Sequence, residues 1–216
     1  MIKELINSKS NKITIVIDAG HGGFDPGKIG INKVLEKDIN LSFTYKLKKL
    51  LEQNDINVIL TRTDNNGLYK NSDTDKKRTD MKKRISIMNS SDALFAISIH
   101  QNSFTQESAR GAQVFYYSKS TEGKLLAETL QDVIKSTMND GNQRLAKANS
   151  SYFLLLRSSC PTVIVECGFL TNRIEAQLLC DDSYQDKMTN AIYLGILEYL
   201  NNYGKTNNTP LAKHRS

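Results

Sequence analysis

Two histidines stand directly after apolar runs of the sequence, where they could bind a metal. His21 follows the run 13–18 within Asp-Ala-Gly-His-Gly-Gly, and His100 follows the run 94–99. The third histidine, His214, lies in a polar tail, so we exclude a site with three histidine ligands. A catalytic zinc site commonly uses two histidines and one carboxylate and leaves its fourth position open.

The acidic ligand of such a site could be Asp18, Glu36 or Glu166, and the residue types alone do not choose among them. Asp18 ends the first apolar run, Glu36 begins an amphipathic segment, and Glu166 follows the run 162–165. A metallohydrolase also needs a second carboxylate that acts as a general base toward water. This set of residues is therefore typical of a metal-dependent hydrolase.

Strands alternate with helices along the chain, which favours an α/β domain. β-branched and apolar runs predict strands at 13–18, 56–61, 94–99, 112–117, 152–156 and 162–165. Helical periodicity predicts helices at 36–53, 121–138, 172–179 and 184–203, and one that is capped by Thr79 and carries Met81, Ile85 and Met88.

We expect one domain built on a twisted, mostly parallel sheet of about six strands, with helices on both faces. Polar residues that follow parallel strands then meet at one edge of the sheet. His21, His100 and Glu166 should therefore face a common cleft.

The composition is that of a globular domain. The 216 residues include 29 Lys and Arg against 23 Asp and Glu, a net charge of +6, and 39% are hydrophobic. This composition excludes a disordered chain, a collagen or a coiled coil. The longest apolar stretch, 93–99, is far shorter than the roughly 18 residues that cross a bilayer. The three cysteines lack the spacing of a zinc cluster or of a disulfide framework.

The densest basic cluster, residues 76–84, is interleaved with acidic residues and has two interpretations, a solvated face or a surface for an anionic polymer. Nucleic-acid binding is not expected, because no aromatic stacking pattern accompanies this cluster. We divide the chain into an N-terminal extension (1–12), a catalytic domain (13–203) and a disordered tail (204–216). Residues 1–12 contain no apolar core of an export signal, so we expect the export segment to be absent from this chain.

The motifs resemble, in order and spacing, those of the zinc-dependent N-acetylmuramoyl-L-alanine amidases, a family of peptidoglycan hydrolases. The resemblance covers residues 13–203. It is carried by Asp18-Ala-Gly-His-Gly-Gly, Leu35-Glu-Lys-Asp-Ile-Asn-Leu, Thr61-Arg, Arg84 to Asn89, Ser98-Ile-His-Gln-Asn and Glu166-Cys-Gly-Phe-Leu-Thr-Asn.

Carried over residue by residue, the resemblance implies that His21, Glu36 and His100 bind one Zn²⁺ and that Glu166 is the catalytic acid/base. The amide between the lactyl group of muramic acid and L-alanine would be the bond that is hydrolysed.

Three further residues are weaker candidates for substrate binding. Arg84 has an alternative role as an internal ion-pair residue that holds a helix. Asn102 could orient His100 or contact the glycan, and Arg157 could meet a peptide carboxylate or a muramoyl oxygen.

Within the family the sequence is most similar to the germination-specific amidases of spore-forming bacteria, the CwlD type. This resemblance implies a peptidoglycan substrate, an extracytoplasmic location in the forespore or cortex compartment, and a step toward muramic-δ-lactam. The chain resembles neither the relatives with an appended wall-binding domain nor those with a self-inhibitory helix, so control by an activating partner protein is our expectation.

Two alternatives remain open from the sequence. The first is another zinc carboxypeptidase or amidohydrolase, for which a soluble peptide would be a better substrate than peptidoglycan. The second is a cell-wall-binding protein without catalysis, which predicts loss of a ligand or of the base, whereas His21, Glu36, His100 and Glu166 are all present.

Overall fold

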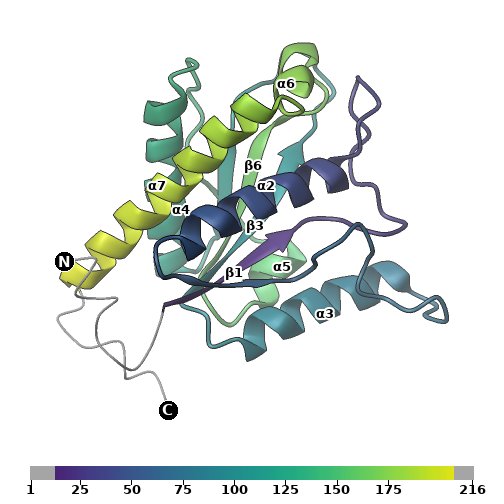
Figure 1. The fold of residues 1–216 in the computed structure, drawn as a ribbon, viewed down its shortest axis with the longest axis horizontal. Coiled ribbons are helices and arrows are strands. Elements are labelled where there is room, and N and C mark those ends of the chain that lie inside the picture. Colours follow the sequence, from purple (N-terminus) through teal and green to yellow (C-terminus); the bar gives the residue numbers. More distant parts are fainter. Residues whose placement is uncertain (1–12, 207–216) are drawn as a thin grey trace.

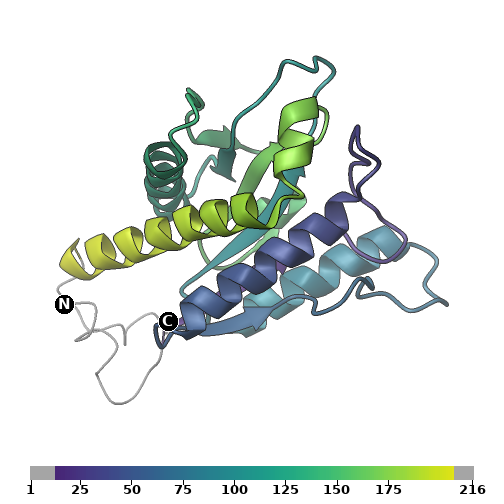
Figure 2. The same ribbon diagram turned by 45° about the horizontal axis from the view of Figure 1, so that its top comes forward.

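A six-stranded sheet runs through the centre of the molecule, and helices cover both of its faces (Figures 1 and 2). The computed structural model of the chain describes residues 13–206. The strands are β1 (Thr14–Ala19), β2 (Asn57–Leu60), β3 (Phe95–Asn102), β4 (Gln113–Tyr117), β5 (Lys147–Asn149) and β6 (Thr162–Phe169). The helices are α2 (Glu36–Glu52), α3 (Lys76–Ser90), α4 (Thr121–Met138), α5 (Phe153–Arg157), α6 (Arg173–Leu178) and α7 (Asp182–Thr206).

The strand order is β2-β1-β3-β6-β4-β5, and every neighbouring pair is parallel except β4 with β6. The predicted fold, a mostly parallel sheet covered on both faces, is therefore confirmed. Because β1, β3 and β6 are mutually parallel, their carboxyl ends lie at the same edge of the sheet.

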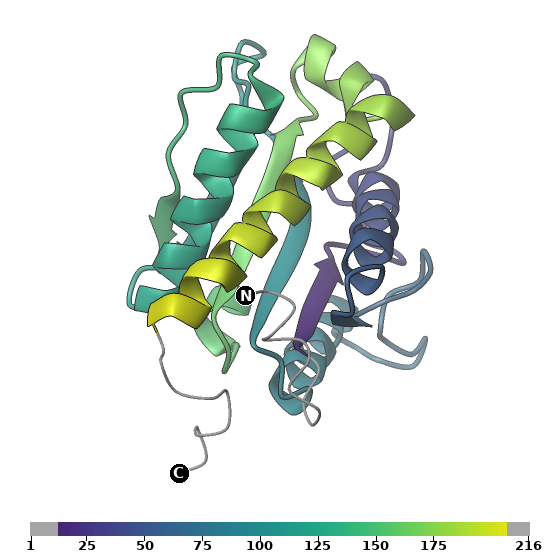
Figure 3. The same ribbon diagram turned by 60° about the vertical axis from the view of Figure 1, so that its left-hand side comes forward.

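Alternate residues of each strand serve two separate hydrophobic layers. Ile15 and Ile17 of β1 pack with apolar side chains of α2, α4 and α7, whereas Val16 packs with those of α3 and α5. Helices α4 and α7 lie side by side over the first face (Figure 3). A strand that is buried on both faces has a nearly continuous apolar sequence. The run ITIVID at residues 13–18 therefore predicts β1 clearly.

The predicted strand 152–156 is wrong, because this segment forms the short helix α5. Asn149 starts the turn: its side-chain oxygen accepts hydrogen bonds from the backbone N–H groups of Ser151 and Tyr152 at 2.8 Å. A short apolar run without glycine or proline does not distinguish a buried strand from a buried helix. The fifth strand of the sheet is β5, which pairs with β4 at the edge.

Other differences concern the ends of helices. α3 begins at Lys76, earlier than expected, because Asp75 rather than Thr79 caps it by accepting a hydrogen bond from the N–H of Arg78. Helix α7 continues to Thr206, so residues 204–206 are helical where the sequence predicts the start of a tail. A glycine near a helix end permits the helix to stop but does not force it.

The predicted extension 1–12 and the remainder of the predicted tail, 207–216, lie outside the described residues. Between residues 13 and 206, no helix combines the length and the apolarity that a membrane crossing requires.

The burial pattern of α5 gives a test of its conformation. Leu154 and Leu155 are both buried and Leu156 is exposed, which a helix allows and a strand of period two does not. We expect Leu155→Ala to lower the free energy of unfolding by about 2–5 kcal/mol. The matched variant Leu156→Ala should change it by less than about 1 kcal/mol. Urea unfolding measures both, and equal losses would contradict the helix.

Candidate metal centre and active site

The predicted site residues gather at the carboxyl edge of the sheet. His21 follows β1 directly, His100 lies near the end of β3, and Glu166 lies on the neighbouring strand β6. His100 and Glu166 are paired in register across these two parallel strands. The expectation that they share one cleft is thus confirmed, since all three line the same pocket.

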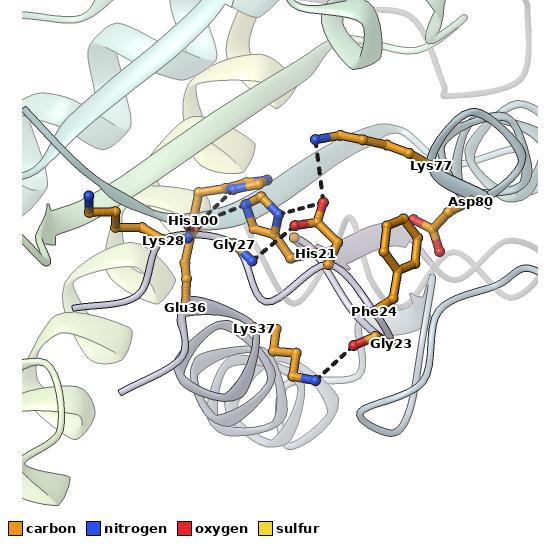
Figure 4. Close-up of polar contacts among 12 residues, drawn as sticks. His21, Gly23, Phe24, Gly27, Lys28, Glu36, Lys37, Lys77, Asp80 and His100 are labelled. Carbon is orange, nitrogen blue, oxygen red and sulfur yellow. Dashed lines mark hydrogen bonds and ion pairs between the residues drawn. The ribbon is translucent and has the colours of Figure 1, made fainter. Parts of the chain in front are cut away.

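His21, Glu36 and His100 form a cluster whose ligand atoms all lie within 4.8 Å of one another (Figure 4). Nε2 of His21 lies 3.1 Å, and Nδ1 of His100 lies 3.0 Å, from the same oxygen of Glu36, Oε1. Of the three acids that the sequence left open, Glu36 is the one that the fold brings between the two imidazoles. Asp18 and Glu166 lie outside this cluster.

Backbone and side-chain donors hold the Glu36 carboxylate in place. The N–H of Lys28 donates to Oε2 at 2.7 Å, and the N–H of Gln101 donates to Oε1 at 3.1 Å. Burial would raise the pKa of Glu36, but its hydrogen bonds with His100 and His21 outweigh that effect and lower the pKa below its usual range. The group is therefore ionised at neutral pH, as a metal ligand must be.

Two glycines make room for the cluster. A Cβ atom at Gly20 would lie 2.2 Å from the His100 ring. Gly27 has a φ of +69°, and a Cβ there would lie 2.6 Å from both Glu36 Oε2 and the His21 ring. Larger residues at these positions would displace the three candidate ligands.

His21 itself has a left-handed backbone, with φ of +62°, which is uncommon for a residue with a side chain. Buried arginines hold the segment in this conformation. Arg84 donates to the carbonyl oxygens of Ala19 and His21, and Arg62 donates to those of Ala19 and Gly20. The backbone that carries His21 is therefore fixed by guanidinium groups from α3 and from the end of β2.

The Arg84 guanidinium is only 2% exposed and forms an ion pair with Asp18 at 2.7 Å. Ser98 and Thr61 also donate to the Asp18 carboxylate. Burial would raise the pKa of Asp18, but Arg84 and these two hydroxyl groups lower it to about 2. Arg84 therefore forms an internal ion pair, as one of its two predicted roles requires, and it also lines the pocket described below. Its role in substrate binding stays a prediction.

Glu166 differs from the other acids of the site. Its Oε2 atom is buried and has no hydrogen-bond partner among the described residues. Burial raises its pKa to about 7; His100 and His21 act against this rise and Glu36 adds to it. A carboxyl group with such a pKa can both accept and donate a proton near neutral pH.

A pocket of about 300 Å³ lies over these groups. Its apolar wall comes from both sides of the cleft and includes Phe24, Met81, Tyr152 and Phe153. The rings of Phe24, Tyr152 and Phe153 are substantially exposed, so they are available to a substrate.

Two predicted substrate-binding residues are not brought into this pocket. Asn102 accepts a hydrogen bond from the N–H of Ser103 at 2.8 Å, and the guanidinium of exposed Arg157 lies over the Phe153 ring. Neither residue is among those that line the pocket. Their roles in binding stay predictions.

Sequence reasoning did not single out Asp25 and Arg62 as site residues, although both contact the loop that carries His21. Asp25 lies four residues after His21, across a glycine-rich turn, and that spacing is the signal that could have identified it. Arg62 stands within a motif, but its burial could not be inferred from the sequence.

Comparison with known proteins gives the family. The family profile described as N-acetylmuramoyl-L-alanine amidase matches residues 15–198, nearly all of the described chain. The chain belongs to this amidase family. Enzymes of this family cleave the amide between N-acetylmuramic acid and L-alanine. Because the chain belongs to the family, it is an amidase and thus a hydrolase.

Several relatives match the amidase along most of their length. The germination-specific N-acetylmuramoyl-L-alanine amidase of Bacillus subtilis (strain 168) is 36% identical over 90% of this chain and 82% of the relative. The CwlD amidase from Clostridioides difficile, solved in complex with the GerS lipoprotein, is 42% identical with a TM-score of 0.85, covering 88% of this chain and 99% of that one. An N-acetylmuramoyl-L-alanine amidase from Clostridium difficile 630 is 35% identical with a TM-score of 0.79, covering 89% and 98%.

The buried Asp18–Arg84 pair gives a testable prediction about stability. Removing one partner of a buried pair leaves the other uncompensated, so Asp18→Asn should cost about 3–5 kcal/mol at pH 7. Because the pKa of Asp18 is depressed in the folded state, its stabilisation is fully present above about pH 4 and is lost as the pH falls through about 2.

The difference in unfolding free energy between wild type and Asp18→Asn should therefore shrink by about 2 kcal/mol as the pH falls from 5 toward 2. Urea titrations at a series of pH values measure it. Asp132→Asn, on the exposed side of α4, is the control. A difference that stays constant over this range would rule out the ionised pair as its source.

Proposed function

We propose that the amidase is zinc-dependent, with His21, Glu36 and His100 as the zinc ligands and Glu166 as the acid/base catalyst. The donor set supports zinc, since two imidazoles and one ionised carboxylate converge and leave room for a further ligand on the pocket side. When bound, zinc would polarise the scissile carbonyl and lower the pKa of an attacking water.

The observation that carries this proposal is the unpartnered carboxylate of Glu166. Its Oε2 atom is buried beside the ligand cluster, and no donor among the described residues competes for it. Glu166 would accept a proton as water adds to the lactyl carbonyl carbon. It would then return that proton to the nitrogen of L-alanine, so that the C–N bond breaks to give a carboxylic acid and a free amino group.

The pocket walls would hold the substrate on either side of that bond. The exposed faces of Phe24, Tyr152 and Phe153 suit a sugar ring or the methyl groups of the lactyl and alanyl units. Arg84 would act indirectly, because its N–H groups are already engaged by Asp18, Asp80 and backbone carbonyls.

We further propose a role in the spore cortex, outside the cytoplasm, where peptidoglycan is the substrate and muramic-δ-lactam the eventual product. The similarity to a germination-specific amidase of Bacillus subtilis supports this role. An activating partner protein is also proposed, because the similar CwlD amidase forms a complex with the GerS lipoprotein.

Glu166→Gln tests the catalytic proposal. The variant keeps the size of the side chain but cannot take up a proton, so we expect peptide release to fall by about 10²–10⁴-fold. Release of peptides that begin with L-alanine from purified peptidoglycan measures the reaction, in enzyme loaded with one equivalent of zinc. Glu128→Gln, at an exposed position of α4, should leave the rate unchanged, whereas chelation of zinc should abolish the activity.

Zinc binding distinguishes the outcomes. We expect Glu166→Gln to bind one zinc ion, because the three proposed ligands are intact. A variant that retains the wild-type rate would contradict the role of Glu166. A wild-type chain that binds no zinc would contradict the metal centre itself.

A further inference from the structure

The carboxylate of Asp25 lies against the ligand cluster without belonging to it. Its Oδ2 atom is 3.1 Å from Nδ1 of His21, while Nε2 of the same ring is 3.1 Å from Oε1 of Glu36. The His21 imidazole therefore sits between two carboxylates, each facing a different ring nitrogen. Only Glu36 also faces His100.

Asp25 is itself held in a defined orientation. The N–H of Gly27 donates to Oδ1 at 3.0 Å, and the ammonium group of Lys77 lies 3.6 Å from Oδ2. The three residues that contact this carboxylate, His21, Gly27 and Lys77, are labelled in Figure 4. Because the Asp25 side chain is 23% exposed, the fixed hydrogen bonds rather than burial determine where it points.

The two histidines differ in what orients their rings. The His100 ring packs so closely on Gly20 that a Cβ atom added there would overlap it, and the His100 backbone belongs to strand β3. His21 stands in a loop with a left-handed backbone. The backbone fixes the point from which the His21 side chain projects, but a contact to the ring must select which ring nitrogen faces the ligand cluster.

We propose that Asp25 is a positioning residue for the metal centre, which keeps a proton on Nδ1 of His21 and so directs the lone pair of Nε2 toward the zinc position. A neutral imidazole carries one proton, and a carboxylate acceptor at Nδ1 selects the tautomer with the free electron pair at Nε2. The negative charge also makes Nε2 more basic and thus a stronger ligand. This inference rests on the proposed zinc dependence.

Zinc affinity tests the proposal directly. The probe is Zn²⁺ alone, titrated in competition with a chromophoric chelator against wild type, Asp25→Ala and Asp25→Asn. We expect Asp25→Ala to raise the zinc dissociation constant by about 10–100-fold. Asp25→Asn should have a smaller effect, because its amide oxygen still accepts a hydrogen bond from Nδ1. Asp132→Asn, which removes an exposed charge on α4, should bind zinc as wild type does.

Nitrogen NMR of the zinc-loaded protein gives a second readout that a general loss of stability would not produce. The chain has only three histidines, so ¹⁵N-histidine labelling gives a spectrum that is simple to assign. We expect His21 to carry its proton on Nδ1, protected from exchange with water in wild type and exchanging faster in Asp25→Ala.

The outcomes separate this proposal from the one it rests on. Zinc affinity within about threefold of wild type in Asp25→Ala, or an unchanged exchange rate at His21 Nδ1, would overturn the positioning role. A weakening in Asp25→Ala that Asp132→Asn reproduces would overturn it as well. Absence of zinc binding in the wild-type chain would instead contradict the proposed metal centre.

Discussion

The ion pair between Asp18 and Arg84 is the interaction on which the rest of the site depends. Asp18 lies next to the last residue of strand β1, and Arg84 reaches it from helix α3. A charged pair this deeply buried is stable only when hydrogen bonds satisfy its remaining atoms, and here hydroxyl groups and backbone carbonyls do so. The carbonyls are those of Ala19, at the end of β1, and of His21, so the hydrogen bonds that satisfy Arg84 also hold the His21 loop in its conformation.

The ligand cluster is a second charged arrangement. In it the Glu36 carboxylate contacts two imidazoles, and all three groups could bind a metal. Glu36 stays ionised because two imidazoles and two backbone N–H groups face it. Glu166, on strand β6, has no such donors, and burial raises its pKa to about 7. Two neighbouring glutamates thus acquire opposite ionisation properties from their surroundings, which is a common physical basis for a division between ligand and acid/base.

Part of the pocket wall comes from two helices that supply no residue of the ligand cluster. Helix α5 supplies an aromatic side to the cleft, and α3 supplies Met81 and Lys77 on the other side. Because these helices pack on the face of the sheet opposite α2 and α7, the pocket is bounded by one layer while Glu36 is supplied by the other. Changes in the walls could alter substrate preference without moving the proposed metal ligands.

The sequence by itself determined the fold class and the candidate ligands. Buried parallel strands are continuous apolar runs, and polar residues that follow such runs must meet at one edge, so His21, His100 and Glu166 could be placed together from the sequence. It did not choose among Asp18, Glu36 and Glu166 by chemistry, nor did it identify α5 as a helix.

Only the tertiary structure decided these points. Glu36 faces the imidazoles because α2 packs over the end of β1, and Asp18 is unavailable because α3 brings Arg84 to it. The role of Asp25 likewise depends on a turn that folds its carboxylate back onto the His21 ring. Sequence patterns record which residues are buried or follow a strand, whereas the pairing of charges depends on contacts between segments far apart in the chain.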